Sequence, residues 1–305
     1  MGSSVLVLEI SSLLNYRKYT KLVEGLDKYE QMVDSTTGRV YPSFFQIGAY
    51  TGRYSCSKPN MQNIPKDPRV RACFVAEDGH RLIIADYSQI ELTVAAELSQ
   101  DSLMIQAFKE GKDLHRQTAA RILGRAEDEI TDKQRMIGKA LNFGLIYGMG
   151  PDRLATQSQN DFGVEMGLDQ ADDYRSKFFG TYQGLDAWHE GEKSNHYRKS
   201  IRTLGNRLIH LENKKITNSL NAPIQGTAAD LIKLALGRLQ RRLAGQRATI
   251  ICMVHDEIII EVVESQVDEV KDLLETTMRE AGEEFLPSVP IRIDTNIGTS
   301  WSSKA

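Results

Sequence analysis

Two aspartates in this sequence stand at the ends of strongly apolar segments, where their carboxylates could hold a metal ion. Asp86 closes the run LIIAD, and Asp256 lies between the two apolar runs of ATIICMVHDEIIIEVVE. If the segments form neighbouring strands, the carboxylates meet at one edge of a sheet and repel each other unless a cation lies between them. Such oxygen ligands select Mg²⁺, and two Mg²⁺ ions support phosphoryl transfer. The alternative for either aspartate alone is an ordinary turn residue.

A second group of residues recurs every four positions in the segment 135–150. Arg135, Lys139, Phe143 and Tyr147 form one slowly drifting stripe if this segment is an α-helix. Two cations followed by two rings suit a ligand that has phosphates at one end and a ring system at the other. The alternative is a buried helix whose basic side chains extend to the surface, and the helix alone does not decide between the two.

Glycines interrupt the same segment. Gly138 costs a helix about 0.5–1 kcal/mol relative to alanine, which predicts a loosely held helix. Gly144, Gly148 and Gly150 lie near its end and fit a helix that swings and ends in a hinge.

The composition is that of a soluble globular protein. The chain has 305 residues, of which 41% are hydrophobic and 26% charged. Its net charge of −3 means that any surface for a polyanion must be a local cluster of cations. Three scattered cysteines exclude a disulfide framework and a CxxC zinc site. No apolar run approaches the roughly 20 residues of a membrane span, so we expect a cytoplasmic protein without a membrane partner.

The elements that must position these residues follow from the hydrophobic pattern. The segment from Arg69 to Asp86 predicts two strands about a turn at 77–79, and the continuous apolar run at 82–85 predicts that the second is buried on both faces. The segment 248–264 predicts a β-hairpin. Between them the pattern is helical, with Asp101 and Asp113 as predicted helix starts. Pro223 is predicted to open a long helix, a further helix is predicted from Ser265 to Glu284, and a last strand follows. We therefore expect two β-rich portions that share one sheet, with a helical insertion between them.

Five segments carry a resemblance to a known family. They are TGRYSCSKPNMQNIP (51–65), DYSQIEL (86–92), RMIGKALNFGLIYG (135–148), NAPIQGTAAD (221–230) and VHDE (254–257). In this order they resemble the motifs of family A DNA polymerases, those similar to bacterial DNA polymerase I. The resemblance covers about residues 13–305.

The resemblance implies an α+β fold, the right-hand polymerase palm, in which helices back an antiparallel sheet and a helical fingers region is inserted. It divides the chain into a thumb stub at 1–30, a first palm part at 31–92, fingers at 93–198 and a second palm part at 199–305. The thumb, which clasps the duplex in this family, is expected to be largely absent.

The resemblance also implies roles for individual residues. The implied catalytic residues are Asp86, Asp256 and Lys139, and the implied ligands of two Mg²⁺ ions, which Mn²⁺ can replace, are Asp86, Tyr87 through its carbonyl, Asp256 and Glu257. The residues implied to bind the incoming dNTP are Arg135, Lys139, Phe143, Tyr147, Glu91, His115 and Gln89. The residues implied to contact primer–template DNA are Arg53, Gln62, Asn63, Asn221, Gln225 and His255.

Some of these implied roles are specific. Lys139 is placed to give a proton to the pyrophosphate leaving group, and Glu91 fills the space that a ribose 2′-hydroxyl needs. The DNA contacts are expected in the minor groove, where acceptors lie at similar positions in every base pair, so that they test pair shape and not sequence. For His115 an ordinary surface histidine remains an open alternative, and the role of His255 is equally open.

The function implied is template-directed DNA synthesis without proofreading, in the cytoplasm of a bacterial or phage-infected cell. A separate chain that supplies the thumb or a processivity function is a candidate partner. Two alternatives stay open: a non-catalytic palm–fingers module that binds primer–template or a partner, and a polymerase specialised for RNA templates or lesion bypass.

Overall fold

The computed structural model describes residues 13, 16, 17, 19, 20, 22–195, 197–211 and 215–304. The predicted helical N-terminus at 1–30 therefore lies partly outside the described residues, and the part at 22–30 is helical. Among the residues described, no helix is both long and apolar enough to cross a membrane.

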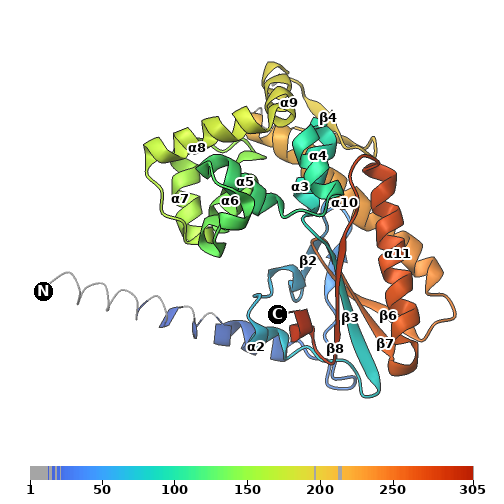
Figure 1. Cartoon of the computed structure of the whole chain (residues 1–305). Coiled ribbons are helices and arrows are strands. Elements are labelled where there is room, and N and C mark those ends of the chain that lie inside the picture. Colours follow the sequence, from blue (N-terminus) through green and yellow to red (C-terminus); the bar gives the residue numbers. More distant parts are fainter. Residues whose placement is uncertain are drawn as a thin grey trace, which may run out of the picture.

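A four-stranded antiparallel sheet forms the centre of the β-rich part (Figure 1). Its strands lie in the order β6 (Ala248–Val254), β7 (Glu257–Val263), β3 (His80–Tyr87) and β8 (Ile293–Gly298). Strand β3 pairs with both β7 and β8, so the two β-rich portions of the sequence share one sheet, as predicted.

Alternate residues of β3 pack into different layers, because successive side chains of a strand point to opposite faces. Ile83 and Ala85 belong to the core that contains residues of helices α10 (Ile216–Arg242) and α11 (Val267–Phe285). Leu82 and Ile84 pack in a second core with residues from four short elements. These elements are β2 (Ser55–Ser57), which pairs with β1 (Ser43–Phe45), then η1 (Met61–Asn63), α2 (Pro68–Arg71) and η4 (Trp301–Lys304).

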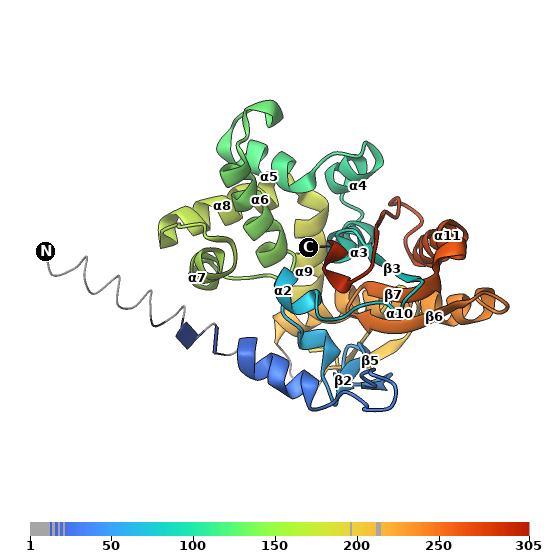
Figure 2. The ribbon, with the colours of Figure 1, turned by 90° about the horizontal axis from the view of Figure 1, so that it is seen from below.

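Helices make up the inserted region, which stands beside the sheet (Figures 1 and 2). They are α3 (Ile90–Ser99), α4 (Ser102–Lys109), α5 (Leu114–Leu123), η2 (Glu127–Glu129), α6 (Asp132–Leu145), α7 (Pro151–Phe162), α8 (Leu168–Thr181) and α9 (Gln183–Ser194). A small hairpin, β4 (Ser200–Arg202) with β5 (Leu208–His210), leads back to α10. The first core continues from the sheet into these helices, so both parts are built on common packing.

Helix starts follow the predicted caps at two places and differ at three others. Asp101 and Asp113 accept hydrogen bonds from the first backbone N–H groups of α4 and α5. Residues 69–71, predicted as the start of a strand, belong to α2 instead, because Asp67 caps a helix whose first residue is Pro68. Pro223 does not open a helix, since α10 begins at Ile216. The last helix begins at Val267 after the turn η3 (Glu264–Gln266), so the predicted start at residue 265 is two residues early.

Candidate active site

Asp86 and Asp256 lie next to each other at one edge of the sheet. Asp86 is the penultimate residue of β3 and faces Glu257, the first residue of β7, in the register of the two strands. The backbone N–H of Tyr87 donates to the carbonyl oxygen of Asp256 at 3.3 Å. The geometry therefore brings together two acids that lie far apart in the sequence.

The donor groups at this edge fit Mg²⁺. The described residues hold no group of three or more His, Cys, Asp or Glu side chains able to bind a metal ion by themselves. Mg²⁺ at sites that act on phosphates needs only one or two carboxylates, because water and phosphate oxygens complete its shell. The side chain of Tyr87 points away, with its hydroxyl donating to the carbonyl of Met278 at 2.7 Å, so its backbone is the part that remains near the acids.

Glu257, the fourth predicted ligand, has other partners. Its carboxylate accepts a hydrogen bond from the indole N–H of Trp301 at 2.8 Å and lies 3.9 Å from the guanidinium of Arg71. Arg71 in turn lies over the Trp301 ring, 4.6 Å from its centroid. These contacts fix the start of β7 against the C-terminal turn η4.

A cavity of about 260 Å³ opens beside Asp256. It collects predicted site residues from three segments that are distant in the sequence. Its charged and polar lining consists of Arg53, Gln62, Glu91, His255 and Asp256. Burial lowers the pKa of His255, and the nearby cations Arg53 and Lys66 lower it further, so this ring is neutral at pH 7.

The loop that carries Arg53 is anchored by residues that sequence reasoning missed. Arg207 donates to the carbonyl oxygen of Thr51 at 2.7 Å and also binds the carboxylate of Asp230. Lys233 donates to the carbonyl oxygen of Gly52, whose φ of +85° favours glycine. Arg53 itself forms an ion pair with Glu91 across the cavity.

Tyr147 lies beside Glu91, one of the residues that line this cavity. Burial raises the pKa of Tyr147, and the adjacent Glu91 carboxylate raises it further, whereas Gln225 of α10 acts in the opposite direction. The phenol is therefore protonated at neutral pH. Because α6 ends at Leu145, Tyr147 stands in the turn that follows the helix, and Gly148 with a φ of +70° completes that turn.

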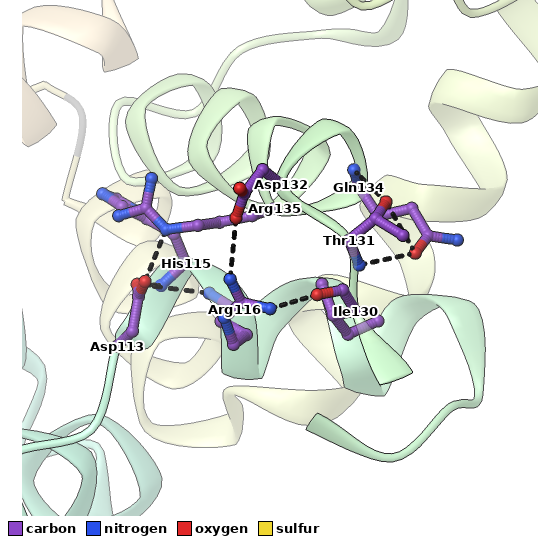
Figure 3. Close-up of polar contacts among 8 residues, drawn as sticks. All are labelled: Asp113, His115, Arg116, Ile130, Thr131, Asp132, Gln134 and Arg135. Atoms are coloured by element: carbon purple, nitrogen blue, oxygen red, sulfur yellow. Dashed lines mark hydrogen bonds and ion pairs between the residues drawn. The ribbon is translucent and has the colours of Figure 1, made fainter. Parts of the chain in front are cut away.

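The cationic end of α6 faces α5, as Figure 3 shows. Arg135 forms an ion pair with Asp113, the N-cap of α5, and Arg116 pairs with Asp132 at 2.9 Å. Burial raises the pKa of Asp113, but hydrogen bonds from Arg135 and the Arg116 backbone outweigh it, so the pKa lies below its usual value. The partnership of Asp113 with Arg135 was not predicted from the sequence.

His115 completes this cluster and is not a surface residue, since only 3% of it is exposed. Its Nδ1 lies 2.9 Å from Nδ2 of Asn142, and its ring centroid lies 5.6 Å from that of Phe143. Burial lowers the pKa of His115 to about 4, Asp113 raises it, and the charges of Arg135 and Lys139 lower it. Thus the buried His115 packs against Phe143 and lies near the charges of Arg135 and Lys139, so that these residues of α5 and α6 form one cluster.

Comparison with known proteins decides the family. Residues 7–303 match the family described as DNA polymerase family A. The chain belongs to DNA polymerase family A. It is 40% identical over 299 residues to DNA polymerase I of Aquifex aeolicus, with 96% of this chain and 51% of that protein covered. It is 37% identical to DNA polymerase I of Pseudomonas aeruginosa, with 95% of this chain and 33% of that protein covered.

This family A chain thus spans about half the length of one relative and a third of the other. A solved structure of the POL domain of Pol1 from M. smegmatis, in complex with DNA primer-template and dNTP, is similar to it with a TM-score of 0.86 and 33% identity. The match covers 95% of this chain and 53% of that chain. The predicted α+β polymerase fold is therefore confirmed.

Gly138 in α6 does not loosen the helix as predicted. A Cβ at this position would overlap the carbonyl oxygen of His115 and lie 2.9 Å from the backbone nitrogen of Ala119. The glycine allows the backbones of α5 and α6 to touch, so it holds the helix close to its neighbour instead of loosening it.

The remaining predicted residues are not among those that line the cavity. Gln89 occupies the N-cap of α3 with a φ of 54°, and Asn63 ends η1. Asn221 and Gln225 lie one turn apart on α10. Among the described residues, the side-chain oxygens of Gln89 and Asn221 are buried without a hydrogen-bond partner. Buried acceptors of this kind are costly, and a ligand with donor groups satisfies them.

Proposed function

We propose that this chain carries out template-directed DNA synthesis. The 3′-hydroxyl of a primer attacks the α-phosphate of a bound dNTP, a new phosphodiester bond forms and pyrophosphate leaves. The observation that carries this proposal is the cavity shared by Asp256, Glu91 and Arg53, with Tyr147 from the turn after helix α6 adjacent to Glu91. The solved relative from M. smegmatis, a complex with primer-template and dNTP, supports the same ligand classes here.

In this proposal the sheet and its backing helices form the palm, at 31–92 and 199–305, and residues 93–198 form the fingers. Residues 1–30 are assigned to a thumb stub. The continuous core between sheet and helices supports a fingers region that is firmly based on the palm.

Asp86, Asp256 and the backbone carbonyl of Tyr87 are the proposed ligands of Mg²⁺, or of Mn²⁺ in its place. When bound, two such ions activate the primer hydroxyl and stabilise the charge on the leaving phosphates. The adjacency of the two acids supports this assignment. We assign Glu257 to a positioning role instead, because its carboxylate binds Trp301.

The nucleotide is proposed to lie along α6. Arg135 and Lys139, next to the buried His115, bind the triphosphate, and Lys139 gives a proton to the leaving pyrophosphate. Phe143 packs on the sugar and base, and Tyr147 covers the template position until the helix moves. Glu91, whose carboxylate is held by Arg53, limits the space at the 2′ position of the sugar.

The DNA is proposed to contact the cavity and its edges. These contacts come from Arg53, Gln62, Asn63, Asn221, Gln225 and His255, with Gln89 beside the nucleotide. The buried amide oxygens of Asn221 and Gln89, which lack partners among the described residues, support ligand contacts at these places. Arg53 contributes a cation next to Gln62 in the cavity lining.

Primer extension by the isolated chain tests the proposal. The wild-type chain should add dNTPs to an annealed primer in a Mg²⁺-dependent reaction, and Asp256→Asn should lower the rate by roughly a thousandfold or more. Asp268→Asn, at an exposed position in the first turn of α11, is the matched control and should keep the wild-type rate. Equal extension by Asp256→Asn and wild type would show that this acid is not part of the chemistry.

Two finer expectations stay predictions. Synthesis without proofreading predicts that a labelled primer with a mismatched 3′ end is extended or left intact, and not shortened. A separate chain that clasps the duplex predicts that products on a long template lengthen when that chain is added at fixed enzyme concentration.

A further inference from the structure

Four polar side chains form a buried chain of contacts behind the cationic face of α5 and α6. They are Tyr182 at the start of α9, Thr118 and His115 of α5, and Asn142 of α6, each at most 3% exposed. Thr118 Oγ1 lies 2.7 Å from the Tyr182 hydroxyl and 2.9 Å from Asn142 Oδ1. Asn142 Nδ2 lies 2.9 Å from His115 Nδ1. None of the synthesis steps proposed above uses Tyr182, Thr118 or Asn142.

The direction of the hydrogen bonds follows from the groups around Asn142. Its Nδ2 also lies 3.5 Å from the carbonyl oxygen of Leu114, where only a donor is favourable. Thr118 Oγ1 donates to the carbonyl oxygen of Leu114 at 2.7 Å and to the amide oxygen of Asn142 at 2.9 Å, so these two acceptors share its one proton. The oxygen of Thr118 then accepts from the Tyr182 hydroxyl. Burial raises the pKa of Tyr182 to about 12, so this phenol keeps the proton that it donates.

This order has a consequence for the imidazole of His115. A neutral imidazole has one donor and one acceptor nitrogen, and the tautomer is set by the partner of one of them. With Asn142 donating to Nδ1, the ring proton must lie on Nε2. Among the described residues Nδ1 is the ring atom with a hydrogen-bond partner, which leaves the Nε2–H edge available to a ligand.

We propose that Asn142 is a positioning residue that holds neutral His115 as the Nε2–H tautomer, so that His115 offers a hydrogen-bond donor to the triphosphate. The triphosphate part of this inference rests on the proposed function. The low pKa of His115, caused first by burial and then modified by Asp113, Arg135 and Lys139, keeps the ring neutral near pH 7. A neutral donor beside two permanent cations adds direction to the phosphate contact without adding charge.

The first test reads the tautomer in the ligand-free chain and requires no activity. Long-range ¹H–¹⁵N correlation spectra of uniformly ¹⁵N-labelled protein near neutral pH distinguish protonated from unprotonated ring nitrogens, and a His115→Gln sample identifies the signal among the six histidines. We expect a protonated Nε2 and an unprotonated Nδ1. A protonated Nδ1, with Asn142 presenting its oxygen, would overturn the proposal.

The second test changes the positioning residue. Asn142→Asp replaces the donor with an acceptor of the same shape, so the ring proton should move to Nδ1. The KM for dNTP should then rise roughly tenfold, the size expected for one lost hydrogen bond to a charged group, with a smaller change in kcat. A ring that stays Nε2–H in this variant, together with an unchanged KM, would contradict the proposal.

Thr118 provides a matched pair of variants for the same question. Thr118→Ser keeps the hydroxyl that holds the Asn142 oxygen and should keep the wild-type tautomer and KM. Thr118→Val has a similar shape without the hydroxyl, so the His115 signals should show a mixture of tautomers and KM should rise. Identical spectra and kinetics for these two variants would contradict the chain of contacts. A wild-type chain that shows the expected tautomer but incorporates no dNTP would overturn only the proposed function.

Discussion

At the scale of single residues, Glu91 joins the two halves of the site. Its carboxylate pairs with Arg53 of the β-rich part and lies beside Tyr147 at the end of α6. The residue thus has a steric effect on the cavity and an electrostatic effect on two neighbours. To separate the two effects, a substitution must change either the volume or the charge of the side chain and keep the other.

Glu91→Ala and Glu91→Gln make this separation. Alanine removes the side chain that fills the cavity, so ribonucleotide incorporation relative to dNTP incorporation should rise at least about tenfold, within the range for a pocket that gains room. Glutamine loses the charge that holds Arg53 but keeps the volume, and it should keep most of the sugar discrimination. Single-nucleotide incorporation with matched rNTP and dNTP measures both ratios. Unchanged sugar selectivity in Glu91→Ala would contradict the steric role.

At the scale of elements, close contacts and shared caps hold the inserted helices together. Gly138 allows α6 to touch the backbone of α5. Asp101 caps two helices at once, because one carboxylate oxygen accepts from Leu103 and Met104 at the start of α4 and the other from Gly184 and Leu185 at the start of α9. Each feature predicts a loss of stability when it is removed.

Gly138→Ala should destabilise the protein although alanine is the better helix former. Its Cβ overlaps His115, and forcing the two helices apart should cost about 1–3 kcal/mol. The matched control is Gly237→Ala in α10, where no atom lies within 4 Å of the added Cβ. That substitution should stabilise by about 0.4–1 kcal/mol through the unfolded chain. Melting temperatures of the two variants should therefore move in opposite directions; a higher melting temperature for Gly138→Ala would contradict the close contact.

Asp101→Ala should cost about 2–4 kcal/mol, because it removes the caps of two helices at about 1 kcal/mol or more each and leaves buried N–H groups without partners. Asp101→Asn keeps one acceptor oxygen and should lie between alanine and wild type. Thermal unfolding followed by far-UV circular dichroism gives the order. If alanine and asparagine are equally mild, the double cap contributes little.

The sequence predicted those elements whose position is set by local signals. The hairpin around Asp256, the buried strand that ends at Asp86 and the starts at Asp101 and Asp113 are set by apolar runs and by caps next to them. The early start of α10 depends on packing around Pro223, which no local rule describes. In the site, Asp113, Arg207 and Asn142 were missed because their roles come from partners that only the folded chain brings near.

At the scale of the whole molecule, two buried histidines make stability depend on pH. Burial lowers the pKa of both His115 and His189 to about 4, and one ring nitrogen of His189 lies 3.2 Å from the carbonyl oxygen of Ile146. In the unfolded chain a histidine has a pKa near 6.5. The unfolded state therefore binds protons first as the pH falls, and folding becomes less favourable between about pH 6.5 and about pH 4.

The melting temperature should accordingly fall on acidification from about pH 7.5 to about pH 5, a range above that in which most carboxylates titrate. His115→Gln and His189→Gln should each make this decrease smaller, because each removes one group whose folded-state pKa is low. His210→Gln, at an exposed position in β5, is the control and should leave the decrease unchanged. Equal slopes in all three variants would show that other groups set the pH dependence.

The close backbone contact between α5 and α6 at Gly138 also affects how the binding of nucleotide and the binding of DNA influence each other. Because α5 and α6 touch through backbone atoms and are joined by the pair of Asp113 and Arg135, the groups proposed to bind triphosphate keep their spacing with or without DNA. Linkage then requires that nucleotide and DNA influence each other through a different part of the molecule. That part is the turn after α6, where Tyr147 meets Glu91. We therefore expect substitutions at these two residues to change the cooperativity between the ligands, and substitutions at Arg135 to change only the affinity for the nucleotide.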